Sequence, residues 1–187
     1  MSALFPFPHW NRSKGSIISA PKTPWAISLG LYLIPMKRLQ FSVTINASPE
    51  IVYDQLTDPK AFAQWSVVFD PNSHLEGSWE KGSLVRLLTY NQAGDLCGLL
   101  SNVRENIPNR KIHLDHMGVL EKGVEIFQGP EVEQLKGASE IYHIIPQGKQ
   151  TRLAIESDAI MDLESYLIET WPLALEKLKE QCEKLNS

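Results

Sequence analysis

The side chain best suited to chemistry in this sequence is His116, which follows Ile112 and Leu114 at two-residue spacing. Residues at this spacing share one face of a β-strand, so His116 is predicted to lie on an apolar, inward face. A buried imidazole needs a hydrogen bond, and burial lowers its pKa, which keeps it neutral and able to donate and accept. We therefore expect His116 to orient a neighbouring strand or to anchor a ligand carbonyl. His113 has the opposite parity, which makes a metal site built from both histidines improbable.

Glu140 and Tyr142 are the second candidate group, because they share a face of a later strand. Such a polar pair could perform acid–base chemistry or hold a ligand, but a solvated face or a local hydrogen bond explains it equally well. The motifs GxGxxG, HExxH and GxSxG are absent, and the glycines of residues 77–83 lack the lysine of a P-loop. The sequence therefore assigns no catalytic residue, metal ligand or cofactor.

The two cysteines, Cys97 and Cys182, belong to no CxxC pair. They are predicted to be small buried hydrophobic residues, since no base can be identified beside either one. This usage indicates neither a disulfide scaffold nor a thiolate zinc site, and it favours a reducing, cytoplasmic location.

Composition describes one soluble globular domain. The chain has 187 residues, of which 43% are hydrophobic and 21% charged, and its formal net charge is −4. An acidic balance argues against attraction to nucleic acid or to an anionic membrane surface.

Residues 1–35 differ from the rest of the chain. They contain three basic residues, no acidic residue and five of the twelve prolines, with no sustained helical or alternating pattern. The apolar stretch 26–34 is shorter than the roughly 20 residues of a membrane span. It is long enough for the core of a signal peptide, so secretion or organelle import is a minor alternative, but no small-x-small cleavage site follows it. Residues 1–35 are predicted to be a disordered extension or a start placed upstream of Met36, and a single domain is predicted over residues 36–187.

From residue 36 the pattern is α+β. Alternation over residues 39–45 predicts a half-buried strand, and Ser48 and Asp58, each followed by proline, predict the caps of two short helices. Turn residues then separate five strands, which short connections make antiparallel neighbours. These strands are expected at about 83–90, 95–105, 110–117, 138–145 and 150–160.

The chain closes with a helix predicted over about residues 162–185. Acidic residues near its start and lysines near its end suit the helix dipole. Its apolar stripe is predicted to consist of Leu167, Trp171, Ala174, Leu178 and Leu185.

This order of elements resembles the START-like helix-grip superfamily, also called SRPBCC or Bet v 1-like. VTINASPE (43–50), LTDP (56–59) and FAQW (62–65) are similar to the opening of bacterial members related to activators of heat-shock chaperone ATPases. Further matching motifs are EGSW (76–79), KGS (81–83), HMG (116–118), GVE (123–125), GASE (137–140), TRL (151–153) and WP (171–172). The resemblance extends from about residue 38 to the C-terminus.

The resemblance implies a curved antiparallel sheet wrapped around the long C-terminal helix, with an apolar cavity between them. We expect this cavity to bind a small hydrophobic molecule, such as a lipid or a polyketide. The alternatives are a cyclase- or dehydratase-like enzyme that uses the same cavity, and a module that binds a chaperone or a second copy of the chain. Residues predicted to contact the ligand are Ile112, Leu114, His116, Glu140, Tyr142, Leu153, Ile155, Leu167 and Trp171.

Overall fold

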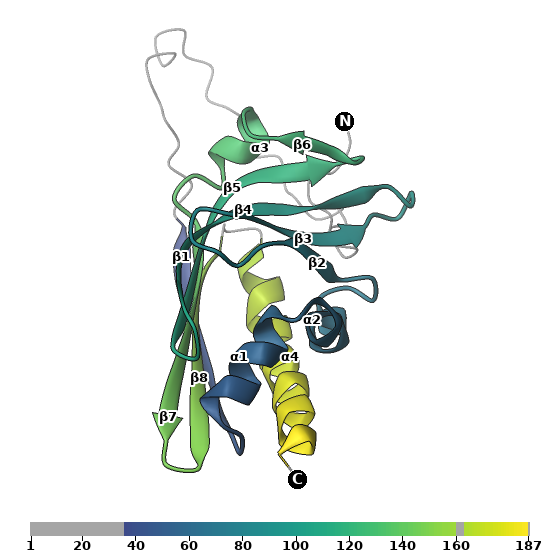
Figure 1. The fold of residues 1–187 in the computed structure, drawn as a ribbon. Coiled ribbons are helices and arrows are strands. Elements are labelled where there is room, and N and C mark those ends of the chain that lie inside the picture. The colour runs from purple at the N-terminus through teal and green to yellow at the C-terminus, as the bar shows by residue number, and fades with distance from the viewer. Residues whose placement is uncertain (1–35, 160–162, 187) are drawn as a thin grey trace, which may run out of the picture.

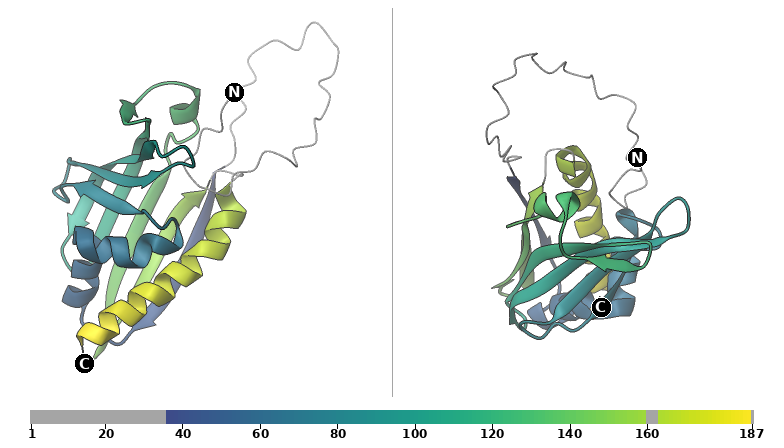
Figure 2. Two further views of the ribbon diagram at one scale, coloured as in Figure 1. Left: turned by 90° about the vertical axis from the view of Figure 1, so that its right-hand side faces the viewer. Right: turned by 90° about the horizontal axis from the view of Figure 1, so that it is seen from above.

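In the computed structural model of the chain, a curved antiparallel sheet wraps around one long helix (Figure 1). The structure describes residues 36–159 and 163–186, so the predictions for residues 1–35 lie outside it. Two views at right angles show the sheet curving around α4 (Glu164–Leu185), which crosses its concave side (Figure 2). The predicted α+β helix-grip architecture is confirmed.

The predicted elements occur in the predicted order, with short additional elements between them. The strands are β1 (Lys37–Ile45), β2 (His74–Gly77), β3 (Leu84–Tyr90), β4 (Leu96–Ile107), β5 (Lys111–Glu121), β6 (Val124–Ile126), β7 (Ser139–Gln147) and β8 (Gln150–Ala159). The helices before α4 are α1 (Pro49–Thr57), α2 (Pro59–Trp65), a 3-10 turn (Ser66–Val68) and α3 (Pro130–Glu133).

In the described residues the strands form one sheet in the order β1-β8-β7-β5-β4-β3-β2. The first half of β5 pairs with β7, and its second half pairs with β6, which lies outside this path. Between these two halves of β5 the register with β4 shifts at Leu100 and Ser101, where Met117 is the extra residue of a bulge. Pairing with β4 and with β6 continues β5 to Glu121, beyond the predicted end at residue 117.

The two short helices begin at their predicted caps. Asp58 Oδ1 accepts hydrogen bonds from the backbone N–H groups of Lys60 (3.0 Å) and Ala61 (2.8 Å), while the Ser48 hydroxyl lies 3.5 Å from the Ile51 nitrogen. These caps fix where α1 and α2 begin. The two helices lie on the concave side of the sheet, and Phe62 and Trp65 of α2 are buried there.

Helix α4 buries most of its predicted stripe. Trp171, Ala174 and Leu178 are buried, and Leu167 is half-buried. The prediction is wrong for Leu185, which is 60% exposed because it ends the helix. Cys182 and Leu175, which the stripe omitted, are buried.

Four short elements had no counterpart in the sequence prediction, namely β2, β6, α3 and the 3-10 turn. Each has three or four residues, too few to show a period, and β2 and β6 exist because a longer strand pairs with them. Within the described residues, no helix is both long enough and apolar enough to span a membrane.

Candidate functional site

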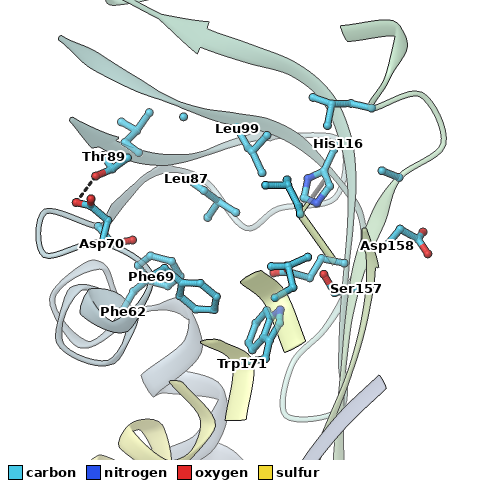
Figure 3. Close-up of a pocket in the computed structure, with 18 of the residues that line it drawn as sticks. Phe62, Phe69, Asp70, Leu87, Thr89, Leu99, His116, Ser157, Asp158 and Trp171 are labelled. Carbon is cyan, nitrogen blue, oxygen red and sulfur yellow. Dashed lines mark hydrogen bonds between the residues drawn. The ribbon is translucent and has the colours of Figure 1, made fainter. Parts of the chain in front are cut away.

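A cavity of about 120 Å³ lies between the concave face of the sheet and the N-terminal half of α4 (Figure 3). The sheet contributes side chains from β3, β4, β5, β7 and β8, and the opposite wall comes from α2, the segment after it and α4. Most of the wall is apolar: it includes Phe62, Trp65, Phe69, Leu87, Leu99, Leu135, Leu163, Leu167 and Trp171.

Strand register brings the polar residues to one part of this cavity. Glu140 on β7 lies directly across from Ser157 on β8, and also from Leu114 on β5. The next inward residue of β5 is His116, and the next inward residue of β7 is Tyr142. His116, Glu140, Tyr142 and Ser157 all line the cavity.

Glu140 and Tyr142 form a buried pair in which the tyrosine hydroxyl donates to Glu140 Oε1. Burial raises the pKa of Glu140 to about 7, although the hydrogen bond from Tyr142 acts in the opposite direction. Burial and the neighbouring carboxyl raise the pKa of Tyr142 far above its ordinary value. Near neutral pH, Glu140 can therefore both release and accept a proton inside the cavity.

His116 is neutral in this site. Burial lowers its pKa to about 4, against smaller opposing effects of Asp158 and Asp115. Its Nδ1 lies 2.8 Å from the hydroxyl of Ser101, a fully buried residue on β4. This is the hydrogen bond to a neighbouring strand that a buried histidine requires.

Trp171 presents an indole N–H that has no partner among the described residues. The side chain is 2% exposed, and it packs against the rings of Phe41, Trp65, Phe69 and Tyr142. In Figure 3 the indole enters the cavity from below with its nitrogen uppermost, while the His116 ring enters from the opposite side.

Two acidic residues that border the cavity already have partners. Asp158 points away from the cavity in Figure 3, and Arg38 holds its pKa below the ordinary value through a bond of 2.8 Å. At the other end, Asp70 accepts hydrogen bonds from the hydroxyl of Thr89 and from the backbone N–H of Asn72. Among the described residues no cluster of three or more histidine, cysteine or acidic side chains could hold a metal ion.

Comparison with known families now identifies the fold. The model of the family described as Activator of Hsp90 ATPase homolog 1-like protein matches residues 46–183. The chain belongs to this family. Membership confirms the resemblance to the START-like, or SRPBCC, superfamily and supports a ligand-binding or chaperone-related module.

Solved structures show the same fold at low sequence identity. Protein NE0264 from Nitrosomonas europaea is 12% identical, with 80% of this chain and 96% of that chain covered and a TM-score of 0.60. The Aha1 dimer from Colwellia psychrerythraea is 21% identical, with coverage of 79% and 97% and a TM-score of 0.59. No match was found among curated proteins.

In this family member, five of the nine residues predicted to contact a ligand line the cavity: His116, Glu140, Tyr142, Leu167 and Trp171. The other four, Ile112, Leu114, Leu153 and Ile155, are at most 1% exposed and belong to the main hydrophobic core. They share the concave face, and they share the main core with Tyr142 and Trp171, but they do not line the cavity.

Sequence reasoning missed the apolar cavity residues outside α4 and the partner of His116. Leu87 and Leu99 face each other on β3 and β4, and a strand alternation extended to these residues could have identified them. Phe69 and Leu135 lie in irregular segments, and no periodic signal precedes them. Ser101 pairs with His116 only because of the bulge in β5.

Proposed function

We propose that this protein binds a small hydrophobic molecule in the cavity between α4 and the sheet. The observation that carries the proposal is an apolar cavity whose lining includes Trp171, with its unpaired N–H, together with His116 and Glu140. Pockets that hold small molecules combine apolar walls with a few placed polar groups in this way.

The polar groups matter because apolar contact alone gives modest affinity. Ten buried methylenes contribute about 8 kcal/mol, whereas association costs about 4–15 kcal/mol. An aliphatic chain without polar anchors should therefore bind no tighter than micromolar. Tighter binding would require hydrogen bonds from the polar groups of the cavity.

Titration of the purified chain tests the proposal. The chain is titrated with a panel of candidate ligands, namely fatty acids, polyketide-like ring systems and single-ring aromatic compounds, and binding is measured by calorimetry. Leu99→Trp should fill the cavity and weaken binding at least tenfold, because Leu99 is a half-buried part of the wall. Ile145→Trp is the matched control, since Ile145 is exposed and does not line the cavity.

No saturable binding to any member of the panel would refute the proposal. Equal binding by the wild type and by a folded Leu99→Trp protein would also refute it, because the ligand would then occupy another place.

A chaperone-interacting module is the second candidate function, and exposed apolar side chains at the β5–β6 hairpin favour it. Met117, Val124 and Phe127 are 43%, 62% and 42% exposed on the β5–β6 hairpin and the residue after it. Solvent-exposed apolar groups that lie together often mark protein interaction sites. The family description adds a partner class, the Hsp90-type ATPases.

Stimulation of an Hsp90-type ATPase by this chain, lost in Val124→Asp and kept in Leu99→Trp, would support the second candidate. For both candidate functions we propose that the protein is located in the cytoplasm. It is supported by the free, buried state of Cys97 and Cys182, and fractionation of the source cells would test it.

A further inference from the structure

The size of the cavity limits the ligand that the proposed function allows. An engineered protein cavity of about 150 Å³ with apolar walls holds one benzene molecule. The cavity described here measures about 120 Å³, so it accommodates a single ring. Aromatic side chains surround this space: Phe69 and Trp171 meet edge to face at a centroid distance of 5.0 Å.

The unpaired indole N–H of Trp171 requires an acceptor. Buried polar groups in folded proteins are nearly always hydrogen-bonded. Both other described tryptophans follow this rule, because Trp65 donates to the Gln55 carbonyl (3.1 Å) and Trp79 donates to the Thr57 carbonyl (2.8 Å). Trp171 differs from them in bordering the cavity with a free donor, which a ligand oxygen could satisfy.

His116 supplies a second donor. Ser101 is fully buried, and its hydroxyl has one described hydrogen-bond partner, Nδ1 of His116. If the hydroxyl hydrogen is to be satisfied, Ser101 must donate to Nδ1. The neutral imidazole then carries its proton on Nε2 and can donate it into the cavity.

Glu140 supplies the acceptor. One of its carboxyl oxygens accepts from Tyr142, and Glu140 itself borders the cavity. A ligand hydroxyl could therefore donate to Glu140 while its oxygen accepts from Trp171 and His116. No lysine or arginine is among the cavity-lining residues of the described chain, so the site offers no cation to neutralise an anionic ligand.

We propose that the cavity selects a neutral single-ring phenol, whose hydroxyl is bound by Trp171, His116 and Glu140. This inference rests on the proposed function and narrows it from hydrophobic molecules in general to one ring with one hydroxyl.

The experiment compares phenol, toluene and benzoate as probes of the 187-residue chain by calorimetry at pH 8, above the pKa of Glu140, so that its carboxylate can accept a hydrogen bond. Phenol should bind about tenfold more tightly than toluene, the difference that corresponds to about one net hydrogen bond. Benzoate should bind more weakly than either, because its charge is uncompensated in the cavity.

Two matched substitutions test how much the unpaired indole N–H of Trp171 contributes to the binding of phenol. Trp171→Phe and Trp65→Phe remove the same atoms from the same cavity wall, but only Trp171 has an unpaired donor. Trp171→Phe should reduce the preference for phenol over toluene by about tenfold, whereas Trp65→Phe should leave this preference unchanged.

An NMR measurement on the wild type covers the case in which Trp171→Phe fails to fold. Phenol should move the assigned Trp171 indole proton downfield as the new hydrogen bond forms. Toluene should not, and the Trp65 indole proton should show no downfield shift with either compound.

The outcomes separate this inference from the proposed function. If toluene binds as tightly as phenol, or if the Trp171 proton does not shift, the inference is overturned and hydrophobic binding stands. If a long-chain fatty acid saturates the cavity while both single rings fail, the inference is again overturned alone. If nothing in either set of compounds binds, the proposed function is overturned as well.

Discussion

Two titratable residues share one cavity, and burial displaces their pKa values in opposite directions. Glu140 is stabilised in its protonated form, with a pKa raised from 4.5 to about 7. His116 is stabilised in its neutral form, with a pKa lowered from 6.5 to about 4. In both cases the low-dielectric surroundings disfavour the charged state. The cavity therefore favours two uncharged side chains near pH 6.

This pair predicts opposite pH dependence for two variants. The stabilisation linked to Glu140 is complete below pH 4.5 and is lost as the pH rises to about 7. The stabilisation linked to His116 is complete above pH 6.5 and is lost as the pH falls to about 4. Each displacement corresponds to about 3 kcal/mol in the free energy of unfolding.

Urea unfolding at several pH values measures the effect. Glu140→Gln leaves the histidine, so its stability should rise from pH 4 to 6.5, while His116→Gln leaves the carboxyl, so its stability should fall from pH 4.5 to 7. The double variant, which lacks both residues, shows how all other titratable groups change the stability with pH, and its profile is subtracted from those of the single variants. Parallel profiles for the two single variants would contradict the prediction.

At the scale of elements, the aromatic wall of the cavity depends on the position and stability of helix α2. Helix α2 carries Phe62 and Trp65, and the segment after it carries Phe69, so the aromatic wall follows from the start of this short helix. A seven-residue helix is marginal by itself, and its capping side chain matters accordingly.

Removal of the two caps should have unequal effects. Asp58→Ala should lower the free energy of unfolding by about 1–2 kcal/mol, because Asp58 satisfies two backbone donors. Ser48→Ala should cost less, since its hydroxyl is at the limit of hydrogen-bond distance from Ile51, at 3.5 Å. Urea unfolding of both variants gives the comparison, and an equal or larger loss in Ser48→Ala would count against it.

At the scale of the whole molecule, hydrogen bonds near both ends of α4 join it to segments that flank the two short helices. Near its C-terminal end, Glu183 accepts from the backbone N–H of Asn46 at 2.8 Å, and Asn186 donates to the Asn46 carbonyl at 2.9 Å. Near the other end, the hydroxyl of Tyr166 donates to the Phe69 carbonyl at 2.7 Å. These bonds connect α4 to the segments before α1 and after α2.

The fold over residues 36–187 is proposed to be independent of residues 1–35. Deletion of residues 1–35 should change the midpoint of thermal unfolding by no more than a few degrees, as measured by calorimetry. A fall of more than about 8 °C, or roughly 2 kcal/mol for a domain of this size, would show that the segment contributes to the folded core.

Local sequence signals were sufficient for the main elements and for several faces. The alternation of β8 buries Leu153, Ile155, Ser157 and Ala159, and Asp58 caps α2 as its position before Pro59 predicts. The inward position of His116 also follows from a two-residue period. Such features depend on neighbours in the chain, so the sequence by itself determined them.

Only the tertiary structure decided which inward residues border empty space. Ile155 and Tyr142 face each other on neighbouring strands and both belong to the main core, yet of the two only Tyr142 also lines the cavity. Periodicity also could not show that the Trp171 N–H lacks a partner while that of Trp65 has one. The physical reason is that cavities and unpaired donors depend on packing among α4, α2 and the sheet, whose contacts join residues far apart in the chain.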